Sequence, residues 1–375
     1  MWNDLQDKYV LYGVGTEGEK FVFRHMEIVD RIVFCIDGYR IGDFHGIPIK
    51  KIEEVDNLFE YKILVAALPE TYVKLKSILE RYGLVEFKHF NWTRYIEKKL
   101  VVINANCYGR ALVAYLKGSK EFCKKYEIYP VPEIHTNETK EINSYLLKNT
   151  DVFVHQDIRM ENAFSYKLSD AYLLPQLPSN CIRITIPNLV GMGSWMFPQH
   201  GDSGKKIKNP YGDGVLLEED IVLDEAYKVE GVRLLEDYRN FYTSYRFSKE
   251  YLDELKTKDM KKLKNRERNW DIQLYEYIED NYHNSACFVD KVHPSIEVLK
   301  QIGKKMLDIL NLPRYNDEEY DCRLGLPMPL LPCVAEYFAL NYEEKEVAEY
   351  YCCTTEELLD VYIKYYMWLR YDIKL

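Results

Sequence analysis

Short apolar runs alternate with helical patterns along this sequence, in two successive cycles. Parallel strands need a crossover segment between them, and that segment is usually a helix. The alternation therefore predicts an α/β fold built on parallel sheets. In the first cycle the predicted strands are residues 9–12, 31–36, 62–67 and 85–89, and the predicted helices end near residue 29 and span 71–82.

The second cycle is longer and ends in helical patterns. Its predicted strands are residues 100–103, 127–131, 151–155, 182–186 and 286–289. Its predicted helices are residues 109–116, 138–148, 234–242, 249–261, 266–282, 295–310, 334–340 and 355–370. Because the polar stretch 91–99 separates the two cycles, we predict a small Rossmann-like domain over residues 1–98 and a second α/β domain, with a parallel sheet and C-terminal helices, over residues 99–375.

Composition narrows the class of protein. Of the 375 residues, 47% are hydrophobic and 29% charged, as in ordinary globular proteins. The net charge of −10 repels a phosphate backbone, which argues against nucleic acid as a partner. No apolar run approaches the ~20 residues that span a bilayer, so we predict that this is not an integral membrane protein. Nine cysteines without a paired framework, and an N-terminus without a signal-peptide pattern, predict a reduced, cytoplasmic protein.

The segment 188–231 shows no clear periodicity, and six of the 18 glycines fall between Gly191 and Gly214. Segments of this length inside a compact domain are typically lids or binding loops, so we predict a lid. Lys205 and Lys206 lie within it, where their side chains could contact phosphate groups.

A glycine pattern follows the first predicted strand. Gly13, Gly15 and Gly18 have the spacing of the dinucleotide fingerprint, in which glycines permit a tight turn and a close approach of phosphate to a helix N-terminus. Asp37 ends the second predicted strand, 19 residues after Gly18, and matches the acidic residue that holds a ribose hydroxyl. Two interpretations stay open, a nucleotide or nucleotide-sugar site and glycines that serve packing alone.

The same region carries a resemblance to a known kind of domain. The segments Ile36-Asp37-Gly38 and Gly42 to Ile49 resemble the small N-terminal domains of bacterial sugar acyltransferases, over residues 8–90. Those domains are similar to nucleotide-sugar binders, so the resemblance implies a nucleotide-sugar ligand here.

Cys107 lies in the segment Asn104 to Arg110, between a predicted strand and a predicted helix. The positive end of a helix dipole favours the thiolate form of a cysteine at that position. A strand, a sharp turn, a nucleophile and a helix together expose a reactive group at the carboxyl edge of a parallel sheet. The alternative is a structural cysteine that packs as a small apolar residue.

Candidate partners for this cysteine follow other predicted strands. His293 can take a proton from a nucleophile, and Asp290 can orient the imidazole. Asn188 can place an amide near a developing oxyanion, and Gln156 can add a polar contact. This order resembles the SGNH hydrolase pattern, with Cys107 in the serine position. We expect Cys107 and His293 to face one cleft, with Asp290 behind the imidazole. No Cys-x-x-Cys or His-Glu-x-x-His pattern occurs, so we predict no metal.

Several segments from residue 100 onward together resemble the WcbI-type polysaccharide biosynthesis domain. They are Asn106-Cys107, Asp151 to Gln156, Ile186-Pro187-Asn188, Arg266-Glu267, His293-Pro294-Ser295, Pro329 to Val334 and Thr354 to Glu357. The resemblance implies an SGNH-like fold, coenzyme A or acetyl-CoA as cofactor, and acyl transfer to a capsular or related glycan. It implies cofactor contacts at Asn106, Gln156 and Arg266. The glutamine usual after the cysteine is replaced by Tyr108.

These observations predict an acyl-CoA-dependent O-acetyltransferase of surface polysaccharide synthesis, with a glycan or nucleotide-sugar acceptor. His293 could deprotonate either Cys107, for a covalent route, or the sugar hydroxyl directly, and both routes stay open. Two other functions also stay open, a carbohydrate esterase that uses the same residues and a non-catalytic sugar-nucleotide-binding module. The sequence leaves the acceptor and the oligomeric state undefined.

Overall fold

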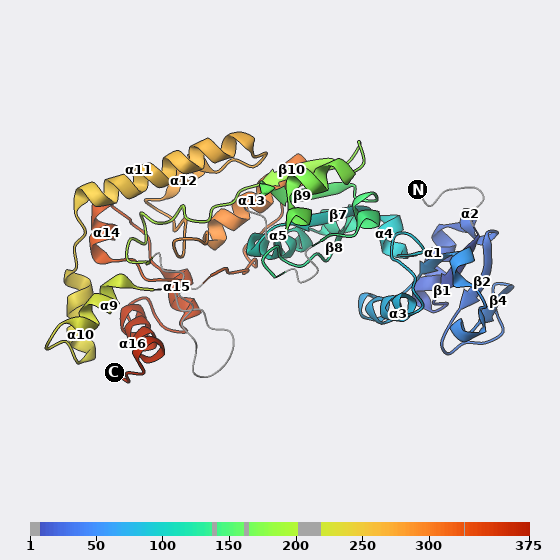
Figure 1. Cartoon of the computed structure of the whole chain (residues 1–375), viewed down its shortest axis with the longest axis horizontal. Helices are drawn as coiled ribbons and strands as arrows, with labels where there is room; N and C mark the ends of the chain where they lie inside the picture. Colours follow the sequence, from blue (N-terminus) through green and yellow to red (C-terminus); the bar gives the residue numbers. More distant parts are fainter. Residues whose placement is uncertain (1–7, 137–140, 161–164, 202–218, 326) are drawn as a thin grey trace. The chain divides into compact units, whose positions relative to one another are not determined.

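The computed structural model describes residues 8–136, 141–160, 165–201, 219–325 and 327–375 (Figure 1). The chain forms two compact units. The first consists of Met1–Asn104 and Glu121–Arg183, and the second of Ala105–Lys120 and Ile184–Leu375. The predicted boundary between residues 98 and 99 separates the strands of two sheets, and as a division into domains it stays a prediction.

A six-stranded sheet lies at the N-terminal end of the first unit. Its strands are β1 (Tyr9–Tyr12), β2 (Ile32–Ile36), β3 (Asp43–Phe44), β4 (Ile47–Lys50), β5 (Lys62–Val65) and β6 (Phe90–Trp92). They lie in the order β3-β4-β2-β1-β5-β6, and all neighbours are parallel except β3 and β4. Alternate residues of β1 enter opposite cores, Val10 and Tyr12 on one face and Tyr9 and Leu11 on the other.

The predicted strand at 85–89 is wrong, because these residues form a turn. Phe87 adopts a φ of +62°, and its N–H donates to the carbonyl of Phe90 at 2.9 Å. The strand therefore begins only at Phe90, as β6.

The helices around this sheet are α1 (Thr16–Arg24), α2 (Met26–Val29), α3 (Pro69–Arg81) and α4 (Thr93–Glu97), with 3-10 turns η1 (Ile52–Glu54) and η2 (Leu58–Glu60). The single helix predicted up to residue 29 is interrupted at His25, whose backbone leaves the helical region. Helix α3 begins with a proline, which lacks the N–H that would be unpaired there.

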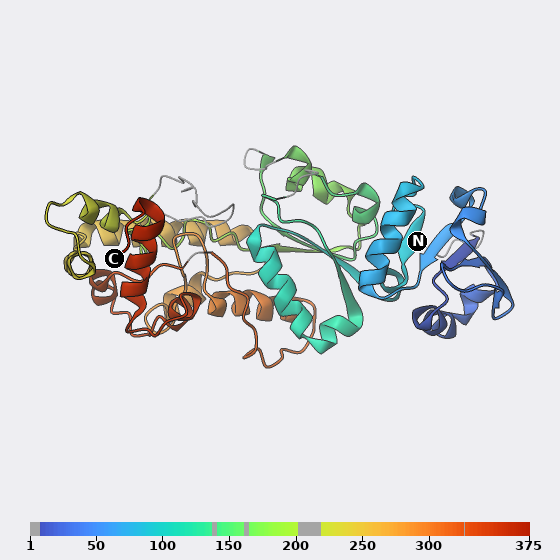
Figure 2. The same ribbon diagram turned by 90° about the horizontal axis from the view of Figure 1, so that it is seen from below.

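A second, four-stranded sheet follows along the chain, and Figure 2 shows it from a second direction. Its strands are β7 (Lys99–Asn104), β8 (Tyr126–Tyr129), β9 (Val152–Gln156) and β10 (Ile182–Ile186). They lie in the order β10-β9-β7-β8, and β7 is parallel to both of its neighbours. Leu100, Val102 and Phe153 bury one face of this sheet in a core of their own. The parallel sheets of the α/β prediction are thereby confirmed.

Short helices accompany the second sheet. They are α6 (Lys120–Lys125), α7 (Ser144–Leu147), α8 (Asp170–Leu173), η4 (Tyr166–Leu168) and η5 (Leu174–Gln176). Of the helix predicted at 138–148, only α7 forms, capped by the side chain of Asn143, while residues 137–140 lie outside the described part of the chain.

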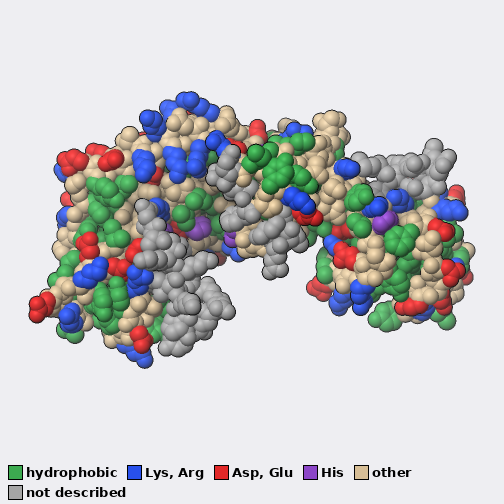
Figure 3. All heavy atoms as spheres, viewed as in Figure 1, with side chains coloured by type: hydrophobic (Ala, Val, Ile, Leu, Met, Phe, Trp, Pro, Cys, Tyr) green, Lys and Arg blue, Asp and Glu red, His purple; other side chains and the backbone are tan. Residues whose placement is uncertain are grey.

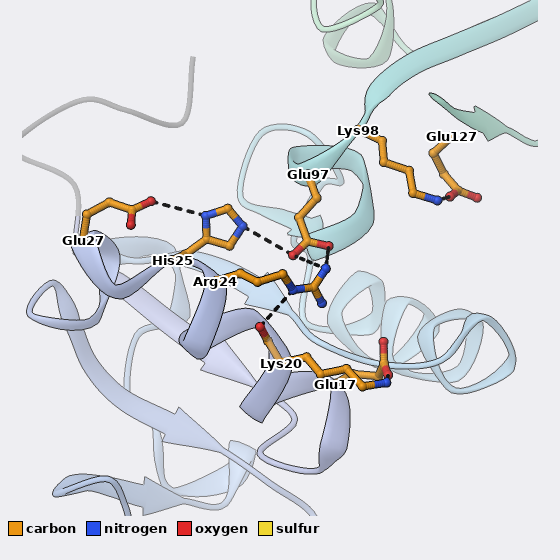
Figure 4. Close-up of polar contacts among 8 residues, drawn as sticks. All are labelled: Glu17, Lys20, Arg24, His25, Glu27, Glu97, Lys98 and Glu127. Atoms are coloured by element: carbon orange, nitrogen blue, oxygen red, sulfur yellow. Dashed lines mark hydrogen bonds and ion pairs between the residues drawn. The ribbon is translucent and has the colours of Figure 1, made fainter. Parts of the chain in front are cut away.

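Polar side chains join the parts of the first unit. In Figure 4, Glu97 of α4 pairs with Arg24 at 3.2 Å and with His25 at 3.3 Å, and Lys98 pairs with Glu127 of β8 at 3.0 Å. A more buried junction surrounds Glu86, whose side chain is 3% exposed.

Three side chains converge on Glu86. It accepts hydrogen bonds from Tyr72 and Lys76 of α3 and from Tyr129 of β8, the last at 2.7 Å. Because Tyr129 belongs to the second sheet, this one carboxylate ties α3 to that sheet.

The second unit is mainly helical. Its helices are α5 (Cys107–Gly118), α9 (Ile221–Lys228), α10 (Leu235–Ser244), α11 (Lys249–Arg266), η6 (Glu267–Asn269), α12 (Tyr275–Asn281), α13 (Ile296–Ile309), α14 (Pro332–Tyr337), α15 (Lys345–Tyr350) and α16 (Leu358–Tyr371). Helices α5 and α13 pack closely, because Gly303 leaves room for the ring of Tyr115 where any Cβ would collide with it. Among the described residues, no helix combines the length and apolar character needed to cross a membrane.

Two predicted elements of this unit are wrong. The helix predicted at 266–282 is broken, because the carboxylate of Glu267 accepts the N–H groups of Leu274 and Tyr275 and so starts α12 afresh. Residues 286–289 form no strand of either sheet, and only an isolated bridge joins Phe288 to Pro294.

The predicted lid is wrong over its described part. Leu189, Met192, Trp195, Met196 and Phe197 are all buried although Val190 is exposed, so this segment belongs largely to the core, and Ile221–Lys228 form α9. Residues 202–218, which include Lys205 and Lys206, lie outside the described residues.

Candidate functional site

Cys107 is the first residue of α5, as the strand–turn–helix pattern predicts. The side-chain oxygen of Asn106 accepts the N–H of Tyr108 at 3.0 Å and caps the helix. The thiol of Cys107 is partly exposed and lies at the positive end of the helix dipole.

Asp290 and His293 form a tight polar turn in the second unit. The buried carboxylate of Asp290 accepts the N–H groups of Val292 and His293 through Oδ1, each at 2.7 Å. Its Oδ2 lies 2.8 Å from Nδ1 of His293. The imidazole is also within hydrogen-bonding reach of the Cys107 thiol. Three residues predicted to act together therefore lie together.

Their charges are coupled. Burial lowers the pKa of His293, but the hydrogen bonds and charges of Asp290 and Cys107 outweigh burial and raise this pKa to about 10. At neutral pH the ring is therefore an imidazolium held between a carboxylate and a sulfur.

The turn is not presented by a strand, contrary to the prediction. Instead, the N–H of Val289 donates to the carbonyl of His293 at 3.1 Å, and the N–H of Met328 donates to the carbonyl of Val289 at 2.9 Å. His293 and Met328 thus give Val289 the backbone partners that sheet neighbours would supply.

Gly325 closes the turn from one side. It has a φ of +78°, and a Cβ on it would lie 2.3 Å from Nδ1 of His293 and 2.4 Å from Oδ2 of Asp290. Only glycine allows the backbone to cover the Asp290–His293 hydrogen bond this closely.

Tyr108 joins the loops that carry the predicted residues. Its hydroxyl donates to the carbonyl of Val292 at 2.8 Å and also meets the backbone of Leu189. Burial raises the pKa of Tyr108 well above the ordinary value, so the hydroxyl stays protonated. The sequence showed Tyr108 only as a departure from a family pattern and gave no signal for this role. Gly325 carried no signal at all.

The remaining predicted residues lie as follows. Asn188 follows β10, and its side-chain oxygen accepts the N–H of Val190 at 3.3 Å. Arg266 ends α11 with an exposed side chain. Gln156 belongs to the first unit, where it ends β9 and is buried. The roles predicted for these residues stay predictions.

In the first unit, the glycine pattern has a clear packing role at two of its three positions. A Cβ on Gly13 would lie 2.4 Å from the carbonyl oxygen of Ala66, and a Cβ on Gly18 would lie 2.3 Å from that of Gly13. A Cβ on Gly15 would meet nothing within 4 Å, so packing does not require glycine there. The carboxylate of Asp37 accepts backbone N–H groups of its own domain, including that of Val14 at 3.2 Å. The nucleotide site stays a prediction.

Within the described residues, no group of three or more His, Cys, Asp or Glu side chains is arranged to hold a metal ion. The side chains that meet at the Cys107 site are its thiol, the imidazole of His293 and the carboxylate of Asp290.

Comparisons with known proteins point to one family. The family model described as "Polysaccharide biosynthesis enzyme WcbI" matches residues 100–315. A solved structure of WcbI, described as a novel polysaccharide biosynthesis enzyme, matches with a TM-score of 0.52 and 18% identity, over 73% of this chain and 97% of that one. It is described as the native protein without a disulfide bond between coenzyme A and one of its cysteines. No curated protein matches the sequence.

Proposed function

The chain belongs to the WcbI family of polysaccharide biosynthesis enzymes, and from this premise we propose that it transfers the acetyl group of acetyl-coenzyme A to a sugar hydroxyl. The observation that carries the proposal is the grouping of Cys107, His293 and Asp290 at the start of α5. A thioester donor and a hydroxyl acceptor need a nucleophile or base, and a group that stabilises the departing thiolate. In the proposed site Cys107 is the nucleophile, and the imidazolium of His293 stabilises the departing thiolate.

The raised pKa of His293 favours a covalent route. The Cys107 thiolate attacks the thioester carbonyl, a new thioester bond forms, and the coenzyme A thiolate leaves with the proton of His293. The neutral ring then takes the proton of the sugar hydroxyl, which attacks the acetyl-cysteine and releases the Cys107 thiolate. Asp290 orients the ring and balances its charge in both steps. The amide of Asn188 is the candidate donor to the oxyanion.

The acyl donor is proposed from two observations. The description of the solved WcbI structure names coenzyme A together with a cysteine of that protein. In this chain Cys107 is the cysteine that lies beside an imidazolium, so we expect the thiol end of coenzyme A at Cys107.

The test is incubation with acetyl-CoA and a panel of glycans and nucleotide sugars, followed by mass spectrometry. A gain of one acetyl group on a sugar supports transfer. Loss of acetyl from an acetylated glycan would instead indicate the esterase, and binding without reaction would indicate a non-catalytic module.

Substitutions separate the covalent route from direct transfer. Losing general acid–base help costs ~100- to 10,000-fold in rate, so His293→Ala should be nearly inactive. Near-complete loss in Cys107→Ser supports the covalent route, and substantial residual activity would indicate direct attack by the hydroxyl. Cys352→Ser, at the exposed cysteine, is the matched control and should keep full activity.

A further inference from the structure

A cavity of about 320 Å³ lies in the second unit, beside the Asp290–His293 turn. Its walls are one face of α11, the segment from Gly191 to Gly201, and Lys291 of the turn itself. Lys291 is two residues from His293 in sequence, so the cavity adjoins the candidate catalytic group without including it.

The lining of this cavity is cationic. Lys258, Lys262 and Lys291 contribute three amines, and Asp259 contributes the one carboxylate of the described lining. That carboxylate already accepts the N–H of Ser194 at 2.9 Å. Three positive groups against one negative group leave the cavity with an excess of positive charge.

Lys262 and Lys291 are partly buried, while Lys258 is exposed. The ammonium of Lys262 is 3.4 Å from the carbonyl oxygens of Val190 and Gly191, which hold it at the cavity wall. Burial, and then the charge of Arg266, lower the pKa of Lys262, and burial lowers that of Lys291. Cations that line the same cavity are stabilised when an anion enters it.

The helix α11, which forms one wall of the cavity, is also basic on its outer surface. Lysine and arginine side chains gather along the edge of the molecule formed by α11 (Figure 3). A surface of this sign attracts an anionic ligand, although the whole chain carries a net charge of −10.

We propose that the cavity lined by Lys258, Lys262 and Lys291 binds a phosphate group of a substrate. The inference rests on the proposed function, in which both substrates can carry phosphate: the acyl donor has a 3′-phosphate and a pyrophosphate, and a nucleotide-sugar acceptor has a pyrophosphate.

The test is calorimetric titration of the double variant Lys258→Gln/Lys262→Gln with four probes. They are coenzyme A, adenosine 3′,5′-bisphosphate, acetyl-pantetheine and a uridine diphosphate sugar. The matched control is Lys261→Gln/Lys264→Gln, which removes the same charge from exposed positions of α11 outside this cavity.

If the donor supplies the phosphate, the double variant should bind coenzyme A and adenosine 3′,5′-bisphosphate about tenfold or more weakly, because charged hydrogen bonds are lost. Binding of acetyl-pantetheine, which lacks phosphate, should be unchanged. If the acceptor supplies it, only the uridine diphosphate sugar should bind more weakly. The control variant should match the wild type in each case.

Equal affinities of the wild type and the double variant for all probes would overturn the subsite, as would a wild type that binds none of them. The proposed function is judged separately by acetyl transfer. If binding depends on the lysines but no acetyl transfer occurs, the subsite is supported and the proposed function is refuted. If transfer occurs but binding does not depend on the lysines, the function is supported and the subsite is refuted.

Discussion

At the scale of single residues, the charge state of His293 decides what the site can do. Asp290 has its carboxylate fully engaged with the turn, through two backbone N–H groups and the imidazole. The carboxylate favours the protonated ring, so removing its charge must lower the pKa of His293.

The substitution Asp290→Asn tests this coupling. We expect the pKa of His293 to fall from about 10 in the wild type, and the alkaline limb of the activity profile to move to lower pH. Histidine NMR titration and a pH profile of kcat/KM measure the two shifts. An unchanged pKa in the variant would show that Asp290 does not control the ring.

The same coupling makes stability depend on pH. Folding raises the pKa of His293 above its ordinary 6.5, so the stabilisation is complete below pH 6.5 and is lost as pH rises through about 10. The free energy of unfolding of the wild type should therefore exceed that of Asp290→Asn by more at pH 6 than at pH 10.

Removing the hydroxyl group of Tyr108 should disturb the turn that carries His293 without removing a reacting group. Tyr108→Phe leaves the partly buried carbonyl of Val292 without its donor, which costs about 1 kcal/mol of stability. Because this carbonyl belongs to the turn that carries His293, we also expect kcat to fall more than KM rises.

The matched control for Tyr108 lies on the same helix. The buried Tyr115 donates to Asp317 at 3.0 Å, away from the turn, so Tyr115→Phe should lose similar stability but keep kcat. Urea unfolding and steady-state kinetics separate the two effects. Equal kcat losses in both variants would reduce Tyr108 to a general packing role.

Sequence reasoning found the residues whose signal is local and missed those whose partners are distant. Cys107 stood out because a helix start is visible in the sequence beside it. The partner of Tyr108 is 184 residues away, and Gly325 meets His293 only through folding of the chain. Neither relation leaves a pattern in the sequence.

At the scale of elements, most strands of both sheets were predicted because each is a short, buried, apolar run. The run at 286–289 has the same character but finds its backbone partners in residues 293 and 328 instead of a sheet. Periodicity cannot distinguish these cases, since a run of four apolar residues fits either.

At this scale, the attachment of α3 to β8 through Glu86 can be tested by substitution. Glu86→Ala leaves Lys76 and two hydroxyl groups without their common acceptor, and breaking a buried pair of this kind costs about 3 kcal/mol or more. Glu80→Ala is the control, because Glu80 is exposed and lies 3.9 Å from the same lysine. It should cost less than about 1 kcal/mol, as measured by urea unfolding.

At the scale of the whole molecule, average properties concealed local ones. The net charge of −10 correctly describes the chain but hides the cationic face of α11. Similarly, the two cycles of alternation predicted two sheets, yet the compact units combine the first sheet with most of the second. The Rossmann-like and SGNH-like descriptions of these regions stay predictions.

The central claim is that Cys107 is a reactive thiol that receives the acyl donor. Peptide-mapped labelling by iodoacetamide, with and without coenzyme A, tests it most directly, because Cys352 is the exposed member of the nine cysteines and would react first if exposure alone decided the order. We predict that Cys107 is labelled before Cys352, that coenzyme A protects Cys107 alone, and that His293→Ala slows its labelling. Labelling of Cys352 first, with no protection of Cys107 by coenzyme A, would contradict the account.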